Sequence, residues 1–523
     1  MAHDLARSLT SKSNRVATED GNNQDVDPEK AVGTGAEAQE SEKDPNQNGN
    51  VEDTDPFLVQ WEEGDKQNPR NWSMRRKWCL VAFLSWITFL TPLASSIFAP
   101  GVPDVQAEFN DYDTVTATFV VSVFVLGFAF GPLVIAPMSE IYGRNPVYHT
   151  CNVLFVLFTI GCATSTDMGM LIAFRFTSGF AGVAIVTCGA GSIADMMPAE
   201  WRGRAISIWS MGPMLGPTIG PVVAGFVIKA LGWRWSFWIV VIASGVTTLA
   251  AFFVLRETYS PVILRQKAAK LRKETGDERW HYTTERAVGE TRTPKQIFLM
   301  SLIRPLRMLF LQPIVTVCAI YIATLYGLMY ILFTTFTFVY EGQYGFGSVG
   351  AGLSFISSGI GMLTGLAIVG NLSDRLYHRA LAADRARSET RLHWVMVGPG
   401  SILVPVGLFI YGWTAYYKVH WIAPMIGSAV MSVGTIIITM CVQTYLVDSF
   451  PTNAASVSAA NTVLRSILGA LLPLCGLNLY DAIGLGWGNS LLGFIALALA
   501  PVPVCLGLFG ERLRTNPKYA IQL

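Results

Sequence analysis

The sequence predicts an all-α integral membrane protein with twelve transmembrane helices arranged as two six-helix repeats. Its 523 residues are 51% hydrophobic and 14% charged, whereas soluble domains carry about 25% charged residues. Twelve apolar windows of roughly 20 residues are long enough to cross a hydrocarbon core of about 30 Å. A hydrophilic stretch over 256–310 separates the first six windows from the last six.

The N-terminal segment, residues 1–78, is expected to be a disordered acidic tail in the cytoplasm. Residues 1–70 contain 16 Asp and Glu but 7 Lys and Arg, and they are nearly free of aromatic residues. Such a segment buries too little apolar surface to offset the entropy of ordering. No apolar signal region precedes residue 79, so the first span itself is expected to direct insertion.

The spans divide into an N-terminal bundle over 79–255 and a C-terminal bundle over 311–510, joined by a cytoplasmic central loop over 256–310 and followed by a cytoplasmic tail over 511–523. Their expected bounds are 79–99, 116–138, 147–165, 169–193, 205–229, 235–255, 311–339, 350–370, 393–412, 421–446, 456–478 and 487–510. With the N-terminus inside, 27 Lys and Arg fall on the cytoplasmic side and 3 in the outer loops. This asymmetry follows the positive-inside rule.

The two halves repeat each other at the ends of corresponding spans. In each half a glycine precedes a Ser-acid pair by eight and nine residues, and an aspartate precedes a proline by three. The matching positions are Gly131 and Gly365, Glu140 and Asp374, and Asp195 and Asp448. Repeats of this kind are typical of membrane transporters.

The sequence lacks the motifs that are typical of several other classes of protein. No Lys/Arg cluster interleaves with aromatic residues, so nucleic acid is not an expected partner. The eight cysteines form no CxxC pair and are expected to be buried, inert thiols, so neither a disulfide framework nor a metal site is predicted. The absence of HExxH and GxSxG disfavours a membrane enzyme, and the absence of GxxxxGK[ST] excludes a nucleotide-driven pump.

Three motifs carry a family resemblance. The run GPLVIAPMSEIYGR over 131–144 resembles the loop 2–3 signature of the major facilitator superfamily, and RFTSG over 175–179 resembles its span 4 motif. The run GPMLGPTIG over 212–220 is similar to the span 5 motif of its antiporters. The phrases NPRNWS, GWRWSFWI and RETYSPVIL resemble the fungal twelve-span drug:proton antiporters.

The resemblance implies a plasma-membrane exporter of lipophilic small molecules, such as drugs, toxins or fungal secondary metabolites. It implies proton antiport by alternating access, with the proton gradient as the energy source and no cofactor, and a monomer in the lipid bilayer. An importer or facilitator of a small nutrient in the same fold is the alternative, which the span 5 motif disfavours. The loop motif departs from the family at Glu140, where Asp is commoner, and at Ile141, which replaces a basic residue.

The loop motif contributes four candidate functional residues, Gly131, Glu140, Gly143 and Arg144, and its repeat contributes Gly365 and Asp374. The resemblance implies that the motif clamps spans 2 and 11 together in one state of the transport cycle. An acid and a guanidinium here could form such interdomain hydrogen bonds. The alternative is a solvated loop pair that contributes under about 1 kcal/mol.

The span 5 motif places small residues on one helix face. Gly212, Gly216 and Gly220 recur every four residues, so they allow close helix approach in lipid. Pro217 and its neighbours at the same period each remove a backbone donor and favour a kink. A bendable helix and a static packing seam both fit this pattern.

Two arginines lie inside predicted spans. A charge at this depth costs roughly 2.5–3.5 kcal/mol, so Arg175 is expected to face a cavity and to have a partner, with snorkelling as the alternative. Arg465 has Asn461 one turn away and is interpreted as either a gate residue or a structural tie.

Proton carriers and the substrate site are the last candidates. No Asp or Glu lies in the middle of a span, so the candidate proton carriers lie near the membrane edges: Asp104, Glu140, Asp195, Glu341 and Asp448. Aromatic residues of span 7 and two amides of the second half are candidates for a cavity that binds a lipophilic ligand: Tyr326, Tyr330, Phe333, Gln443 and Asn461. Packing of these aromatic rings against lipid is the alternative.

Overall fold

The computed structural model describes residues 57–62, 64–282, 294–382, 387–450 and 453–514, all within the unit Pro56–Leu523. Residues 1–56 of the predicted tail lie outside the described residues. Eleven described segments are long and apolar enough to cross a membrane. The last, Ser456–Arg514, has 59 residues and is long enough for two crossings. Gly484 has a φ of +79° within it, so the chain turns between predicted spans 11 and 12.

The first half is built from six long helices and a short extension of the first. They are α1 (Met74–Ser96), extended by η2 (Ala99–Gly101) and α2 (Val102–Phe109), then α3 (Thr114–Tyr142), α4 (Arg144–Ala163), α5 (Met168–Met196), α6 (Ala199–Leu231) and α7 (Arg234–Val254). Aspartate side chains cap the N-termini of α3 and α5. The carboxylate of Asp113 accepts from the backbone nitrogen of Thr116 at 3.0 Å, and that of Asp167 accepts from the backbone nitrogen of Met170 at 2.8 Å.

The second half repeats this arrangement with more breaks. Its elements are α11 (Pro313–Tyr344), α12 (Ser348–Ala382), η3 (Ser388–Leu392), α13 (Trp394–Tyr416), α14 (Ile422–Ser449), α15 (Ala454–Leu471), η5 (Leu472–Cys475), α16 (Gly476–Leu499) and α17 (Val502–Arg514). The described chain is therefore the predicted twelve-span, two-repeat fold. Helices are the element expected here, because in lipid they satisfy their backbone hydrogen bonds internally.

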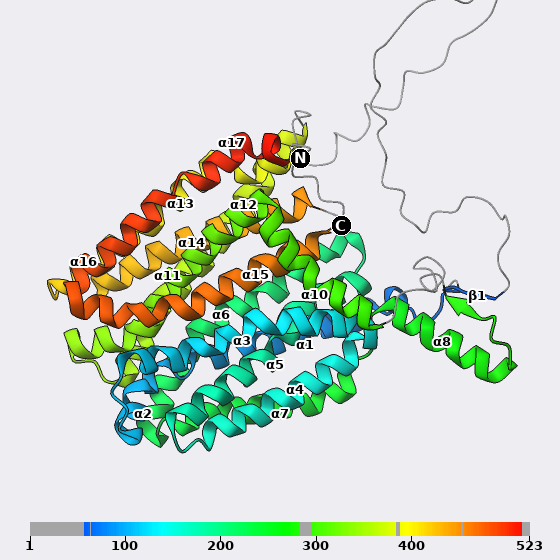
Figure 1. Cartoon of the computed structure of the whole chain (residues 1–523), viewed down its shortest axis with the longest axis horizontal. Coiled ribbons are helices and arrows are strands. Elements are labelled where there is room, and N and C mark those ends of the chain that lie inside the picture. Colours follow the sequence, from blue (N-terminus) through cyan, green and yellow to red (C-terminus); the bar gives the residue numbers. More distant parts are fainter. Residues whose placement is uncertain (1–56, 63, 283–293, 383–386, 451–452, 515–523) are drawn as a thin grey trace, which may run out of the picture. The chain divides into compact units, whose positions relative to one another are not determined.

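The two halves meet along two pairs of helices. In Figure 1, α4 and α7 lie at one edge of the bundle, and α13, α16 and α17 lie at the other. Between these edges α3 packs against α15, and α6 packs against α12. Glycines allow this close approach: a Cβ on Gly352 of α12 would lie 2.3 Å from the carbonyl oxygen of Pro221 in α6.

The prediction that the chain is disordered as far as residue 78 is wrong at its C-terminal end. Strand β1 (Leu58–Val59) pairs in parallel with β2 (His281–Tyr282), and η1 (Pro69–Asn71) precedes α1. Val59 packs against Leu264 and Ala268 of α8 (Ser260–Thr275). These few apolar contacts order a segment whose composition is otherwise that of a tail.

The central loop also contains helices. Besides α8 it holds α10 (Pro294–Leu311), which contacts α3 of the first half and α11 and α15 of the second. The eight cysteines are all free, and five are buried as predicted. The prediction of burial is wrong for Cys79, Cys475 and Cys505, which are exposed because they lie on outward faces of their helices.

Candidate functional site

Arg175 of α5 is 1% exposed, and three backbone carbonyls hold its guanidinium. One terminal nitrogen donates to the carbonyls of Ser95 at 2.7 Å and Val121 at 3.1 Å, and the other donates to that of Ala94 at 3.2 Å. Ala94 and Ser95 belong to the last turn of α1, whose carbonyls lack helical partners. Arg175 therefore joins α5 to α1 and α3, and it does not snorkel.

Aromatic rings complete the surroundings of Arg175. Its guanidinium carbon lies 5.5 Å from the ring centre of Phe98, 5.2 Å from that of Phe124 and 5.8 Å from that of Phe237. No ion pair joins it to a carboxylate within the described residues. Carbonyl dipoles and ring faces thus compensate a charge that the sequence predicted to have a specific partner.

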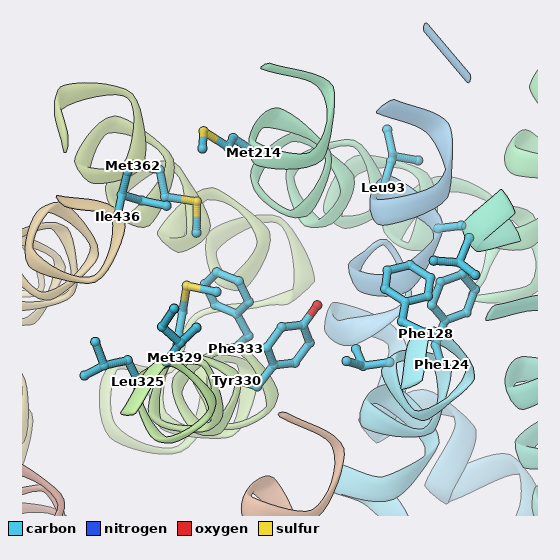
Figure 2. Packing of buried hydrophobic residues seen from close by; sticks show 14 of the residues in the cluster. Leu93, Phe124, Phe128, Met214, Leu325, Met329, Tyr330, Phe333, Met362 and Ile436 are labelled. Carbon is cyan, nitrogen blue, oxygen red and sulfur yellow. The ribbon is translucent and has the colours of Figure 1, made fainter. Parts of the chain in front are cut away.

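The aromatic candidates of span 7 stack along α11. The ring centres of Tyr326 and Tyr330 are 4.9 Å apart, and those of Tyr330 and Phe333 are 5.7 Å apart. Tyr330 and Phe333 are buried. Figure 2 shows the Tyr330 hydroxyl pointing from α11 toward Phe124 of the first half. These rings face the boundary between the halves and not the outside of the bundle.

A line of contacts connects the two arginines across this boundary. The hydroxyl of Tyr330 lies 3.4 Å from that of Ser95, whose carbonyl accepts from Arg175. On the other side the Arg465 guanidinium carbon lies 4.9 Å from the ring centre of Tyr326. Arg465 itself is half-buried in α15.

The predicted amide candidates form a small network beside Arg465. The side-chain nitrogen of Asn461 donates to the side-chain oxygen of Gln443 at 2.9 Å, and that of Gln443 donates to the Ser458 hydroxyl at 3.2 Å. Gln443 lies on α14 and the other two on α15, so the network joins these helices within the second half.

At the end of the bundle where α1 begins, Arg144 pairs with Asp195 and not with Glu140. We call the end of the bundle where α1 begins the loop end, and the opposite end the far end. The guanidinium Nε of Arg144 donates to the carboxylate of Asp195 at 2.7 Å, and both side chains are largely buried. Glu140 is exposed and has neither a hydrogen bond nor an ion pair within the described residues. The loop motif therefore ties α4 to α5 in this conformation.

Glu257 completes this charge cluster; it belongs to the run RETYSPVIL but was not among the candidate site residues. Its carboxylate accepts from the backbone nitrogens of Arg144 and Asn145, both at 3.1 Å, and so caps the start of α4. Gly143 must be glycine here, because its φ is +101° and a Cβ would lie 2.4 Å from Glu257. The Arg144 guanidinium carbon lies 5.2 Å from the ring centre of Tyr259, and burial raises the pKa of that tyrosine.

The second half has a matching ion pair, but its arginine comes from a different part of the chain than Arg144 does in the first half. Arg391 of η3 donates to the carboxylate of Asp448 at 2.9 Å and to the Ser373 hydroxyl at 3.4 Å. Asp448 thus occupies the place of Asp195, as the repeat predicted. Its partner comes from the α12–α13 connection, which carries no motif. The side chain of Asp374 lies outside the described residues.

The glycines of the motifs sit at helix contacts. A Cβ on Gly131 would lie 2.9 Å from the Phe180 carbonyl in α5, and one on Gly365 would lie 2.9 Å from the Val433 carbonyl in α14. Gly212, Gly216 and Gly220 face the backbone of α1: the nearest atoms to their added Cβ would be 2.8, 2.7 and 2.9 Å away. Pro217 lies within α6, which is assigned as one helix over its whole length.

Hydrogen bonds between the halves gather toward the far end. Five join described residues of α1–α7 to described residues of α11–α17, counting the Ser95–Tyr330 contact. The other four are Ser122 to the Ala470 carbonyl (2.8 Å), Thr114 to Asn478 (2.6 Å), Thr337 to the Ala99 carbonyl (3.2 Å) and Ser348 to the Gly225 carbonyl (3.4 Å). The halves are therefore closed against each other at this end.

The remaining acid candidates, Asp104 of α2 and Glu341 of α11, lie at the far end. Asp104 is exposed and Glu341 is half-buried. Within the described residues no group of three or more His, Cys, Asp and Glu could hold a metal ion.

Two helix bundles that repeat each other and meet along α3–α15 and α6–α12 are the arrangement of a two-repeat membrane transporter. The family description of the Major Facilitator Superfamily matches residues 84–473. The chain is 48% identical over 468 residues to the MFS-type transporter penM of Penicillium rubens, covering 89% of this chain and 91% of that one. It is 46% identical over 476 residues to the efflux pump radE of Floropilus chiversii, covering 90% and 87%.

Solved structures show the same fold. The xylose transporter XylE from E. coli, in a partially occluded inward-open conformation, superposes with a TM-score of 0.58 at 13% identity, covering 83% of this chain and 99% of that one. The protein belongs to the major facilitator superfamily. It is a multi-pass membrane transporter.

Proposed function

We propose that the protein exports lipophilic small molecules across the plasma membrane by proton antiport and alternating access, acting as a monomer. The observation that carries this proposal is the gathering of the hydrogen bonds between the halves toward the far end. A transporter that alternates must break such contacts to open that side. Export as the direction is supported by the similarity to a chain named as an efflux pump.

Both termini are proposed to lie in the cytoplasm, which makes the loop end the cytoplasmic end. The excess of Lys and Arg there supports this orientation. In this orientation the described conformation is closed toward the outside.

The substrate is proposed to bind between the halves, beside the stacked rings of α11. Tyr330 and Phe333 offer apolar faces, and the Tyr330 hydroxyl is a polar handle. No Asp or Glu lies within the twelve apolar windows. The proton carriers are therefore proposed among the acids at the helix ends. Within the described residues Asp195 and Asp448 form ion pairs, whereas Glu140, Asp104 and Glu341 form none, which favours these three.

The test is efflux from cells with and without the protein, over a panel of hydrophobic toxic compounds. We expect lower accumulation of some compounds when the protein is present, and loss of this difference when a protonophore collapses the gradient. Efflux that persists with the gradient collapsed would contradict proton antiport. Higher accumulation would contradict export.

A further inference from the structure

Arg465 differs from the other intramembrane arginine in having no hydrogen-bond or ion-pair partner within the described residues. Arg175 donates to three carbonyls through its terminal nitrogens, whereas no nitrogen of Arg465 donates a hydrogen bond within the described residues. The Nε of each arginine is buried without an acceptor. It lies inside an apolar span, where a charge costs roughly 2.5–3.5 kcal/mol. A half-buried guanidinium with an aromatic contact but no acceptor at this depth indicates a site that a ligand completes.

A second unpartnered atom lies on the same helix face. Asn461, one turn before Arg465, is 1% exposed, and its side-chain oxygen is a buried acceptor without a partner. Its nitrogen is fixed by Gln443 at 2.9 Å, so the oxygen is the group left to bind. A donor and an acceptor without partners thus lie one turn apart on α15.

An aromatic ring contacts the guanidinium of Arg465, and no carboxylate of the described residues forms an ion pair with it. The Tyr326 ring lies 4.9 Å from the guanidinium and continues into Tyr330. The twelve apolar windows contain no Asp or Glu, so the protein supplies no carboxylate at this depth. A guanidinium binds a carboxylate through two parallel hydrogen bonds, and such pairs are strongest where water is excluded.

We infer that Arg465 binds the anionic group of the transported molecule, so that the substrates are lipophilic weak acids. The acid group pairs with Arg465, and the apolar rings of the molecule pack on Tyr326 and Tyr330. This inference rests on the proposed function, since it names the substrate class of that same site. The inferred site does not accept lipophilic cations as substrates, because the positive charge of Arg465 repels them.

The test compares a carboxylate with its neutral amide on the same ring skeleton. The full-length protein in lipid nanodiscs is titrated with 1-pyrenebutyrate and with 1-pyrenebutyramide, and the signal from empty nanodiscs is subtracted. We expect the carboxylate to bind about tenfold more tightly. Arg465→Gln should bring the two affinities together, and Arg465→Lys should keep part of the preference, because it keeps the charge but not the planar fork.

Two further variants keep the test decisive. Asn461→Asp places a carboxylate beside Arg465 and should abolish the preference while the arginine remains. Arg512→Gln removes a charge from an exposed position on α17 and should leave the preference unchanged.

Equal binding of both probes by the wild-type protein, binding of neither, or a preference that survives Arg465→Gln would overturn the inference. The assay needs neither a gradient nor a direction of transport, so its failure would leave the export proposal standing.

Discussion

At the scale of single residues, backbone carbonyls of α1 and α3 accept from Arg175, and the carboxylate of Asp448 accepts from Arg391. Arg175 stood out as an arginine inside a span, yet its partners are carbonyls in the last turn of α1 and on α3. Backbone carbonyls have no sequence signal. The sequence did not predict Arg391 as the partner of Asp448 either, because Arg391 lies 57 residues away in a connection that carries no motif.

Arg175→Lys should lose most efflux per molecule at the cell surface, although the charge is kept. A lysine side chain is shorter than that of arginine and offers one nitrogen in place of two, so it cannot satisfy all three carbonyls at once. Each buried carbonyl left unpaired costs about 1–3 kcal/mol. The measurement is efflux normalised to surface protein. Arg512→Lys, on the exposed face of α17, is the matched control and should behave like wild type. Normal efflux by Arg175→Lys would show that the fork geometry is unimportant.

Asp195→Asn should lower the melting temperature of the purified protein more than Asp448→Asn does. The Arg144–Asp195 pair is the more buried: its side chains are 13% and 21% exposed, against 18% and 35% for Arg391–Asp448. Loss of a hydrogen bond to a charged group costs about 1.5–3 kcal/mol, and exposure reduces that cost. A larger effect of Asp448→Asn would refute this ranking.

At the scale of elements, long apolar runs predicted the spans well because lipid allows little except helices. The strand pair was missed, since β1 and β2 have two residues each and show no alternating pattern. For the span 5 motif, the sequence predicted close packing of the glycines but not the helix that they contact. Its glycines face α1 as close-packing predicts, but sequence spacing alone could not name that helix.

Gly216→Ala should reduce both stability and efflux, whereas Gly203→Ala in the same helix should not. A Cβ at Gly216 would lie 2.7 Å from the backbone nitrogen of Leu93, but at Gly203 nothing lies within 4 Å. Overpacking of this kind costs about 1–3 kcal/mol, while the control gains up to about 1 kcal/mol of helix propensity. Thermal unfolding and efflux of the two variants measure the difference. Equal thermal stability and equal efflux of the two variants would show that the contact between α6 and α1 accommodates an added methyl group.

At the scale of the whole molecule, the repeat predicted two bundles, but not which end of their boundary is closed. That depends on pairs such as Thr114 with Asn478, which are 364 residues apart and belong to no motif. The conformation is a property of both halves together.

The proposed orientation predicts that two sequons stay unmodified. Asn71 in η1 and Asn371, near the end of the apolar part Ser348–Ser373 of α12, are exposed at the loop end. A glycan would be expected on them if that end were outside. Tyr112→Thr creates a sequon at Asn110, at the far end, and should be glycosylated. The measurement is the mobility shift on glycosidase treatment. A glycan on Asn71 or Asn371 would invert the topology.

The most direct test of alternating access is to lock the far end. Thr114→Cys combined with Asn478→Cys, in a Cys475→Ser background because Cys475 is exposed nearby, places two thiols where the native side chains touch at 2.6 Å. Oxidation should join the halves and reduce efflux to background, reduction should restore it, and each single-cysteine variant should be unaffected. Full efflux with the disulfide formed in every molecule would contradict the account, because the halves would then transport without separating at this end.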